Sequence, residues 1–267
     1  MKTRFIAILL FGLLIYSCTK VPITGRKQLK LFPESQMIAM SLTAYQDYLN
    51  ENPPESDSNA NTQMIKRLGE RISTSVEKYL TDNGHAKRIE GFQWEFNYVD
   101  DPTVNAWAMP GGKVLFYQGI IDVAGSEDAL AVVMGHEVAH AVAYHGNERM
   151  STGLSAQLGL TALNVAMSEN PTVTNQLFLQ AAGVGTQLGM LKFSRNHETE
   201  ADKMGLIFMA MAGYDPREAP KFWERMAAQS QGAPPEFLST HPSHDRRVAD
   251  LEAFMPEALK YYKPQQD

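Results

Sequence analysis

The sequence predicts an α+β fold: a predominantly helical domain with a small three- to four-stranded sheet before one long, apolar helix. Three observations lead to this prediction. Apolar residues recur at helical spacing over residues 37–49 and 65–80, alternate with polar residues over residues 92–98, and return to a helical pattern from Ser126 onward. With 267 residues, of which 44% are hydrophobic and 20% charged, the chain can bury a substantial core.

Residues 1–17 are typical of an export signal peptide and are not expected to belong to the fold. Lys2 and Arg4 precede an apolar run, residues 5–16, that contains no charged residue. A run of about a dozen residues is shorter than the roughly 20 that cross a bilayer. We therefore favour a signal peptide over an uncleaved membrane anchor.

Cys18, the only cysteine of the chain, ends this segment. The residues before it, Ile15-Tyr16-Ser17, resemble a bacterial lipoprotein signal, although Tyr16 departs from the small residue usual at its position. We therefore expect an exported bacterial lipoprotein, periplasm-facing and attached to a membrane through lipid on Cys18. The outer membrane is favoured, because Thr19 is not the aspartate that signals inner-membrane retention in some bacteria.

The remaining chain divides into an extended lipidated tether, residues 18–32, and a single domain, residues 33–267. Pro33 opens the first helical pattern. A polar linker over residues 51–61 separates it from the second, which stops at Asn83-Gly84.

The strands of the predicted sheet follow. Residues 92–98 alternate between aromatic and polar side chains, as in a half-buried strand. Residues 104–109 and 114–117 read as two more strands, joined by Pro110-Gly111-Gly112. We expect a mostly antiparallel sheet.

The long helix is expected to begin after Ser126, a plausible N-cap, and to run to about Arg149. Residues 150–192 are apolar and carry one charged residue, Glu169, before Lys192. They are interpreted as a buried helical hairpin; the alternative is a surface that contacts a bilayer or a hydrophobic client. Further helices are expected near residues 194–212, from Asp215 and from Ser243.

The charge balance excludes one class of function. The formal net charge is −6, and an acidic surface lacks the basic footprint that nucleic-acid binding needs. No nucleic-acid partner is expected.

The long helix carries the pattern HExxH as His136-Glu137-Val138-Ala139-His140. Residues four apart lie on one face of a helix, so the two imidazoles can bind one zinc ion. Glu137 is placed beside them, where it can hold a water molecule. A helix with two buried, hydrogen-bonded histidines is the weaker interpretation.

A catalytic zinc site has three protein ligands, and the third must come from outside this helix. The continuation HExxHxxGxxH is absent, because residue 143 is Ala and residue 146 is Gly. On the helix near 194–212, Glu198 and Asp202 share one face, so either can be the ligand while the other orients a ligand. Glu200 points away from both and is expected to be solvated.

These motifs resemble the gluzincin metallopeptidases of the HtpX-like, CAAX prenyl protease-like and BepA-like type. HEVAH is followed by SRNHETEAD at 194–202, and NAWAMPGGKVLFYQGI at 105–120 is similar to the family's strand segment before the zinc helix. STHPSHDRR at 239–247 resembles the family's HP motif. PITGRKQL at 22–29 resembles the start of the exported BepA-like lipoprotein members, which we expect to be the closest.

The resemblance implies roles for single residues. Glu198 would be the third zinc ligand, Asp202 would pair with a ligating histidine, and Arg195 would support the acidic cluster. An extended substrate would lie along an edge strand and pair through its backbone. That strand comprises Asn105, Ala106, Trp107, Ala108 and Met109.

The resemblance also implies that His241, in the HP motif, lies over the zinc, where it would either assist catalysis or cap the metal as a fourth ligand. The alternative is a loop histidine that only packs. His85, His145, His197 and His244 are interpreted as structural or solvated.

Taken with the resemblance, the sequence predicts a zinc metalloendopeptidase with one zinc ion per chain. Its substrates would be exported envelope proteins that are misfolded or unassembled, and Glu137 would be the general base for an activated water. A second hypothesis is a mainly latent assembly or quality-control factor whose zinc is capped by His241.

Overall fold

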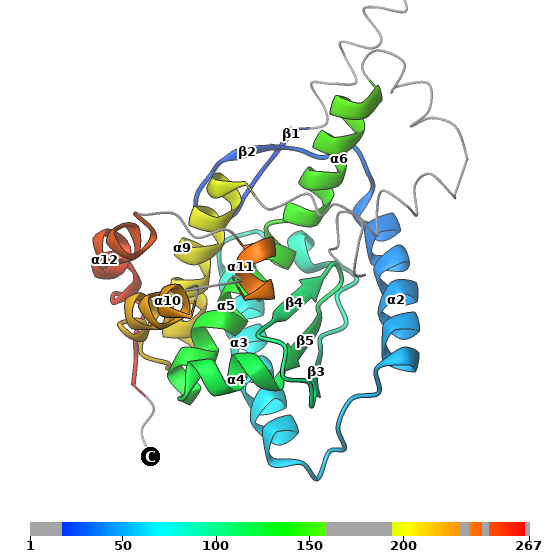
Figure 1. Cartoon of the computed structure of the whole chain (residues 1–267). Coiled ribbons are helices and arrows are strands. Elements are labelled where there is room, and N and C mark those ends of the chain that lie inside the picture. Colours follow the sequence, from blue (N-terminus) through cyan, green and yellow to red (C-terminus); the bar gives the residue numbers. More distant parts are fainter. Residues whose placement is uncertain (1–17, 159–193, 230–234, 242–245, 265–267) are drawn as a thin grey trace, which may run out of the picture.

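The computed structural model describes residues 18–158, 194–229, 235–241 and 246–264 of the chain (Figure 1). The signal-peptide prediction for residues 1–17 lies outside these residues, as does most of the apolar region, residues 159–193. The strands are β1 (Cys18–Lys20), β2 (Lys27–Leu29), β3 (Glu95–Val99), β4 (Ala106–Met109) and β5 (Lys113–Tyr117). The helices are α2 (Glu34–Glu51), α3 (Ala60–Asp82), the short 3-10 helix η1 (Ala86–Ile89), α4 (Gln118–Ala124), α5 (Glu127–Val142), α6 (His145–Leu158), α9 (Arg195–Met211), α10 (Glu218–Ala228), α11 (Glu236–Thr240) and α12 (Arg247–Ala258). Within these ranges, no helix combines the length and the apolar character that crossing a membrane requires.

The fold is α+β, as the sequence predicts. A three-stranded sheet in the order β3-β5-β4 lies between α2 on one side and α3 with α5 on the other (Figure 1). Neighbouring residues of β3 point to opposite faces of the sheet. Phe96 packs on Gly69 of α3, whereas Asn97 donates a hydrogen bond to Tyr45 of α2. The mostly antiparallel pairing predicted for this sheet is wrong for one of its two strand pairs. β4 runs antiparallel to β5, but β3 pairs with β5 in parallel.

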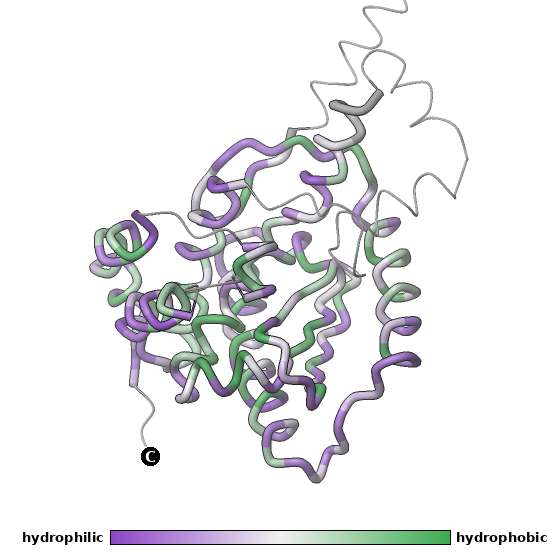
Figure 2. The backbone as a smooth tube through the Cα atoms, in the orientation of Figure 1, coloured by the Kyte–Doolittle hydropathy of each residue, from purple (hydrophilic) through white to green (hydrophobic). Residues whose placement is uncertain are grey.

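α5 is the central helix of the core. Every residue from Ala129 to Val142 is buried, and Figure 2 shows hydrophobic residues gathered around α5 and the neighbouring sheet. Ser126 caps the helix as predicted, since its side chain accepts a hydrogen bond from the Ala129 amide at 3.2 Å. Because other elements surround α5 on all sides, the helix has no solvent-exposed polar face.

α5 packs most extensively against α9, and two glycines set their separation. A Cβ added to Gly135 would lie 2.8 Å from the carbonyl oxygen of Gly205, and one added to Gly205 would lie 2.9 Å from the Gly135 carbonyl carbon. Backbone therefore contacts backbone at this crossing. His136 follows the first glycine and Asp202 lies one turn before the second, so the contact brings these two side chains together.

The prediction of one helix running to Arg149 is wrong, because the chain breaks after Val142. Tyr144 has φ +58°, a left-handed conformation uncommon for a residue other than glycine, and α6 then begins at His145. The break is held by Arg88. Its guanidinium lies over the Tyr144 ring, 3.9 Å from the centroid, and donates to the carbonyls of Val142 and Ala143 at 2.7 and 2.9 Å. These contacts satisfy acceptors that the helix end would otherwise leave free.

The segment predicted to be a tether contains β1 and β2, which pair antiparallel and lie across α9 and α6 (Figure 1). Gln28 of β2 is buried and donates a hydrogen bond to the Ala143 carbonyl at 2.7 Å. Residues 18–29 therefore pack on the end of α5.

Candidate metal centre

Four buried side chains from three helical segments meet at one point. His136 and His140 come from α5, Glu198 from the first turn of α9, and His241 from the residue that ends α11. One ligand atom from each lies within 4.8 Å of the other three. Because two of these histidines are one turn apart on α5, the spacing of HExxH produces the pair, and the α5–α9 crossing supplies the carboxylate.

The short distances in this cluster suit a cation. His136 Nε2 lies 3.0 Å from His140 Nε2 and 3.2 Å from His241 Nδ1, and Glu198 Oε1 is 3.3 Å from His241 Nδ1. Imidazole nitrogens and a carboxylate are all electron-pair donors, so only shared protons or a bound cation can bring them this close. Nitrogen and oxygen donors in this number are what zinc takes in proteins, so the residues present fit the metal.

Asp202 and Arg247 form the second layer of contacts behind this cluster. Asp202 Oδ1 lies 2.9 Å from His136 Nδ1, and Arg247 donates to Asp202 at 2.7 Å and to Glu198 at 3.1 Å. Burial opposes ionisation of Asp202, but Arg247 and His136 outweigh it and lower the pKa of this carboxyl below its ordinary value. A carboxylate paired in this way fixes which ring nitrogen of His136 is free to bind metal.

Arg195, predicted to support the acidic cluster, lies exposed at the start of α9. The arginine that contacts both acids is Arg247 of α12, which is 1% exposed and stacks on Trp223 at 3.3 Å. The sequence offered a signal for it: Arg247 closes the STHPSHDRR stretch that also contains His241.

Glu137 lies beside the cluster and is also buried. It accepts a hydrogen bond from the backbone of Ala108, and its Oε1 atom lies 3.5 Å from His241 Nε2. Among the residues that the structure describes, Oε1 has no hydrogen-bond partner. Burial raises the pKa of Glu137 above its ordinary value, so this carboxyl group gains a proton more readily than an exposed glutamate does.

The predicted substrate strand lies at the edge of the sheet. β4 is last in the strand order and pairs with β5 on one side. Asn105, Ala106 and Met109 are buried, whereas Trp107 and Ala108 are partly exposed. Since the Ala108 backbone contacts Glu137, this edge leads directly to the cluster.

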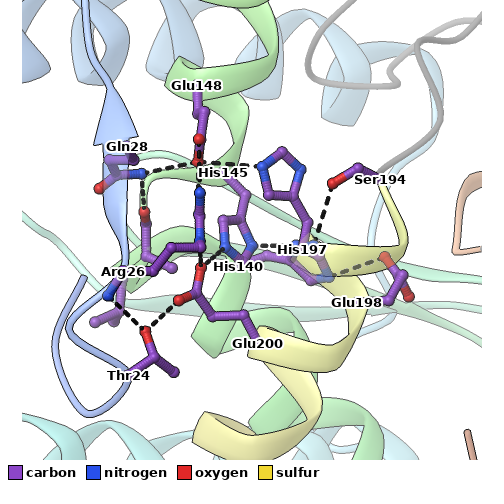
Figure 3. A network of polar contacts seen from close by, with 12 residues as sticks. Thr24, Arg26, Gln28, His140, His145, Glu148, Ser194, His197, Glu198 and Glu200 are labelled. Carbon is purple, nitrogen blue, oxygen red and sulfur yellow. Dashed lines mark hydrogen bonds and ion pairs between the residues drawn. The ribbon is translucent and has the colours of Figure 1, made fainter. Parts of the chain in front are cut away.

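Sequence reasoning missed a second buried network, drawn in Figure 3. Glu200, predicted to be solvated, is 4% exposed, and its Oε2 atom lies 3.0 Å from His145 Nε2. The prediction for Glu200 is wrong because residues 18–29 cover this face of α9. Arg26 contacts Glu200 and Glu148, and His197 lies 3.1 Å from Glu148 (Figure 3). His145 and His197 belong to this network; His85 is exposed, and His244 lies outside the described residues.

Comparison with known proteins places the chain in a family. Residues 66–255 match peptidase family M48. The chain is 41% identical over 193 residues to the mitochondrial metalloendopeptidase OMA1 of Schizosaccharomyces pombe, covering 70% of this chain and 53% of the relative. It is 31% identical over 262 residues to the human mitochondrial metalloendopeptidase OMA1, covering 94% of this chain and 49% of the relative. The β-barrel assembly-enhancing protease of Escherichia coli is 29% identical over 196 residues, covering 71% of this chain and 38% of the relative. The chain thus spans about half the length of the curated relatives it matches, or less.

These relatives correct the predicted localisation. The relatives of higher identity are mitochondrial by name, which contradicts an exported, outer-membrane bacterial lipoprotein and does not support the expected closeness to BepA-like members. Basic N-terminal segments without acidic residues occur both in secretory signal peptides and in mitochondrial transit peptides. The charge pattern of residues 1–17 therefore could not decide the compartment. Lipid on Cys18 stays a prediction.

The family and the four converging donors together confirm the gluzincin resemblance and the zinc prediction. The motifs that carried the resemblance lie where the geometry needs them, with HEVAH on the buried helix and HETEAD on the helix that crosses it. The chain belongs to peptidase family M48.

Proposed function

We propose that this protein is a zinc-dependent endopeptidase that hydrolyses peptide bonds in misfolded or unassembled proteins. The observation that carries the proposal is the convergence of His136, His140, Glu198 and His241 beside the buried carboxyl of Glu137. Relatives named metalloendopeptidase support the reaction, and a relative named β-barrel assembly-enhancing protease supports a link to protein assembly.

In this proposal, His136, His140 and Glu198 hold the metal. Zinc, when bound, supplies a Lewis acid that polarises a carbonyl and makes a water molecule more acidic. Glu137 would take one proton from the water molecule that adds to the peptide carbonyl carbon, and would return it to the leaving amine nitrogen as the C–N bond breaks, a task that its raised pKa favours. Asp202 keeps the outer nitrogen of His136 protonated, so that Nε2 faces the metal.

Substrate is proposed to lie along the edge of the sheet formed by β4. An extended peptide there would pair with the strand through backbone hydrogen bonds, as a further strand of the sheet. Asn105, Ala106, Trp107, Ala108 and Met109 would provide this edge, and the contact of Ala108 with Glu137 would bring the scissile bond to the base.

The test compares Glu137→Gln with wild type in zinc content and in cleavage of casein. The amide cannot accept the proton, so we expect normal zinc content and a loss of activity of at least ~100-fold. Glu224→Gln, an exposed position on α10, is the matched control and should behave as wild type. Cleavage by Glu137→Gln at the wild-type rate would disprove the proposed mechanism.

A second candidate function is a mainly latent factor in which His241 caps the metal. The position of His241 favours it, because Nδ1 lies 3.2 Å from His136 Nε2 and the ring stacks on Phe237, with 4.6 Å between ring centroids. His241→Ala separates the possibilities. Faster cleavage would support a capped enzyme, slower cleavage a role for His241 in catalysis, and unchanged cleavage and metal binding would remove both.

A further inference from the structure

The two histidines of HExxH differ in what holds their outer ring nitrogens. His136 Nδ1 faces the carboxylate of Asp202 directly. His140 Nδ1 instead faces another histidine, with 2.9 Å between it and His145 Nδ1. The orientation of His140 therefore depends on what fixes His145.

The hydrogen bonds around His145 allow one arrangement of protons when His140 acts as a ligand. His140 Nε2 faces the metal cluster and must be unprotonated to bind metal, so Nδ1 carries the proton. That N–H donates to His145 Nδ1, which leaves the proton of His145 on Nε2. His145 Nε2 then donates to Glu200 Oε2 at 3.0 Å. The carboxylate of Glu200 is thus the end point that fixes both rings.

Glu200 is in turn held by the loop between β1 and β2 (Figure 3). Arg26 Nε donates to Glu200 Oε2 at 2.7 Å, and the hydroxyl of Thr24 donates to Oε1. The same guanidinium forms a two-pronged contact with Glu148, with both hydrogen bonds 2.7 Å long. Such a planar, bidentate contact fixes direction as well as charge, which a lysine cannot reproduce.

The loop that presents these side chains is itself strained. Ile23 has φ +68°, unfavourable for a β-branched residue, and it stands next to Thr24. The turn is closed by the Val21 amide, which donates to the Arg26 carbonyl at 2.9 Å. A strained conformation of this kind persists where surrounding contacts over-determine it, and such positions cluster at functional sites.

A second contact joins the same residues to the helix that carries His140. Gln28 Nε2 donates to the Ala143 carbonyl, and Gln28 Oε1 accepts from Arg88, which also binds that carbonyl. Residues 18–29 thus hold both the ring of His140 and the end of α5.

We propose that residues 18–29 position the metal ligand His140, with Arg26 as the positioning residue that acts through Glu200 and His145. The proposal rests on the zinc site of the proposed function. It assigns to residues 18–29, which the sequence predicts to be a tether, a part in building that site.

The test uses the full chain and Co²⁺ as the probe, because its visible absorption reports ligand geometry. Arg26→Gln should weaken Co²⁺ binding about tenfold and change the absorption spectrum. A tenfold loss is the lower end of the loss in metal affinity that follows when a ligand's supporting contacts are removed. Arg26→Lys, which keeps the charge but loses the fork, should fall between Arg26→Gln and wild type. Lys27→Gln is the matched control, since it removes the same charge from the exposed neighbouring residue and should bind as wild type.

Urea unfolding in the presence of a chelator separates positioning from general stability. Thr24→Val is measured alongside, in case Arg26→Gln does not fold, and should weaken Co²⁺ binding with little change in unfolding. Wild-type affinity and spectrum in folded Arg26→Gln or Thr24→Val would overturn the proposal, as would equal losses in Lys27→Gln. If wild type itself binds no Co²⁺, the proposed function fails. If wild type binds Co²⁺ and the variants bind it equally well, this inference fails while the proposed function stands.

Discussion

His136 and His140 stand one turn apart on the same buried helix, yet each is supported from a different end of the chain. Behind His136 lie Asp202 and then Arg247, from a C-terminal helix. Behind His140 lie His145 and Glu200, and then Arg26, from the N-terminal strands. We call the contacts behind His136 the C-terminal route and those behind His140 the N-terminal route. Both routes end in an arginine, but the N-terminal route contains one more side chain, the ring of His145. The side chain of its arginine, Arg26, is also more exposed, at 28% against 1% for Arg247.

The difference is reflected in the pKa values of the two histidines. Burial lowers the pKa of His136, but hydrogen bonds to Asp202 and Glu198 outweigh it and raise the value to about 9. Burial dominates at His140 and lowers its pKa well below the ordinary value. The direct contact with the Asp202 carboxylate therefore favours the charged form of His136, whereas His140, which faces His145, is favoured as a neutral ring.

The largest effect is expected from Arg247→Met. Removal of this buried guanidinium leaves His136 as the remaining cationic partner of Glu198 and Asp202, and removal of one partner of a buried ion pair costs about 3–5 kcal/mol. The free energy of unfolding in urea, measured with a chelator, should fall by that amount. Arg246→Met, at the exposed neighbouring position, is the control and should change it little. A loss no larger than that of the control would mean that the C-terminal route adds no stability.

A smaller effect is expected on zinc affinity when the two acids are compared. Asp202→Asn removes the carboxylate that contacts a ligand and should weaken zinc binding about 10–100-fold. Glu200→Gln acts through His145 and should weaken it less. Competition with a chromophoric chelator measures both. Equal losses, or a larger loss for Glu200→Gln, would contradict the ranking of the two routes.

The smallest effect concerns acid stability. Burial opposes ionisation of Glu148, but hydrogen bonds from Arg26 and His197 hold its pKa at about 2, below the ordinary value of 4.5. A carboxyl whose pKa is lower in the folded state stabilises the fold above pH 4.5, and this stability is lost as the pH falls towards 2. Between pH 7 and pH 3, wild type should therefore lose more stability than Glu148→Gln, by about 1 kcal/mol after allowance for solvent at Arg26. Unfolding curves at the two pH values measure it, and parallel losses would show that the N-terminal route carries no such charge pairing.

The candidate zinc-binding face of α5 could be predicted because its signal is local. His136, Glu137 and His140 are fixed relative to one another by helix geometry alone, and Ser126 marks the start of that helix. Glu198 and Asp202 followed from the same spacing on one further helix. The resemblance then indicated which of the two is the ligand.

The N-terminal route could not be predicted, because the steps beyond His145 join residues far apart in sequence. Arg26 and Glu200 are separated by 174 positions. The helical pattern that placed Glu200 away from Glu198 was read correctly, but it cannot show which strand covers the opposite face. Nor does periodicity reveal the left-handed Tyr144, without which His145 would continue α5 and would not turn back to His140. Parallel pairing of β3 with β5 escaped prediction for the same reason, since strand order is a property of the whole sheet.

The contact between Gly135 and Gly205 bears on how the core of this domain can be redesigned. Since main-chain atoms set the distance between α5 and α9, the apolar side chains around the site can be exchanged, volume for volume, without moving the ligands relative to each other. One methyl group at either glycine would instead have to push a backbone aside. We expect the most conservative of all substitutions, glycine to alanine, to be among the least tolerated in the domain, and these two positions to be the first that any repacking of the core must leave alone.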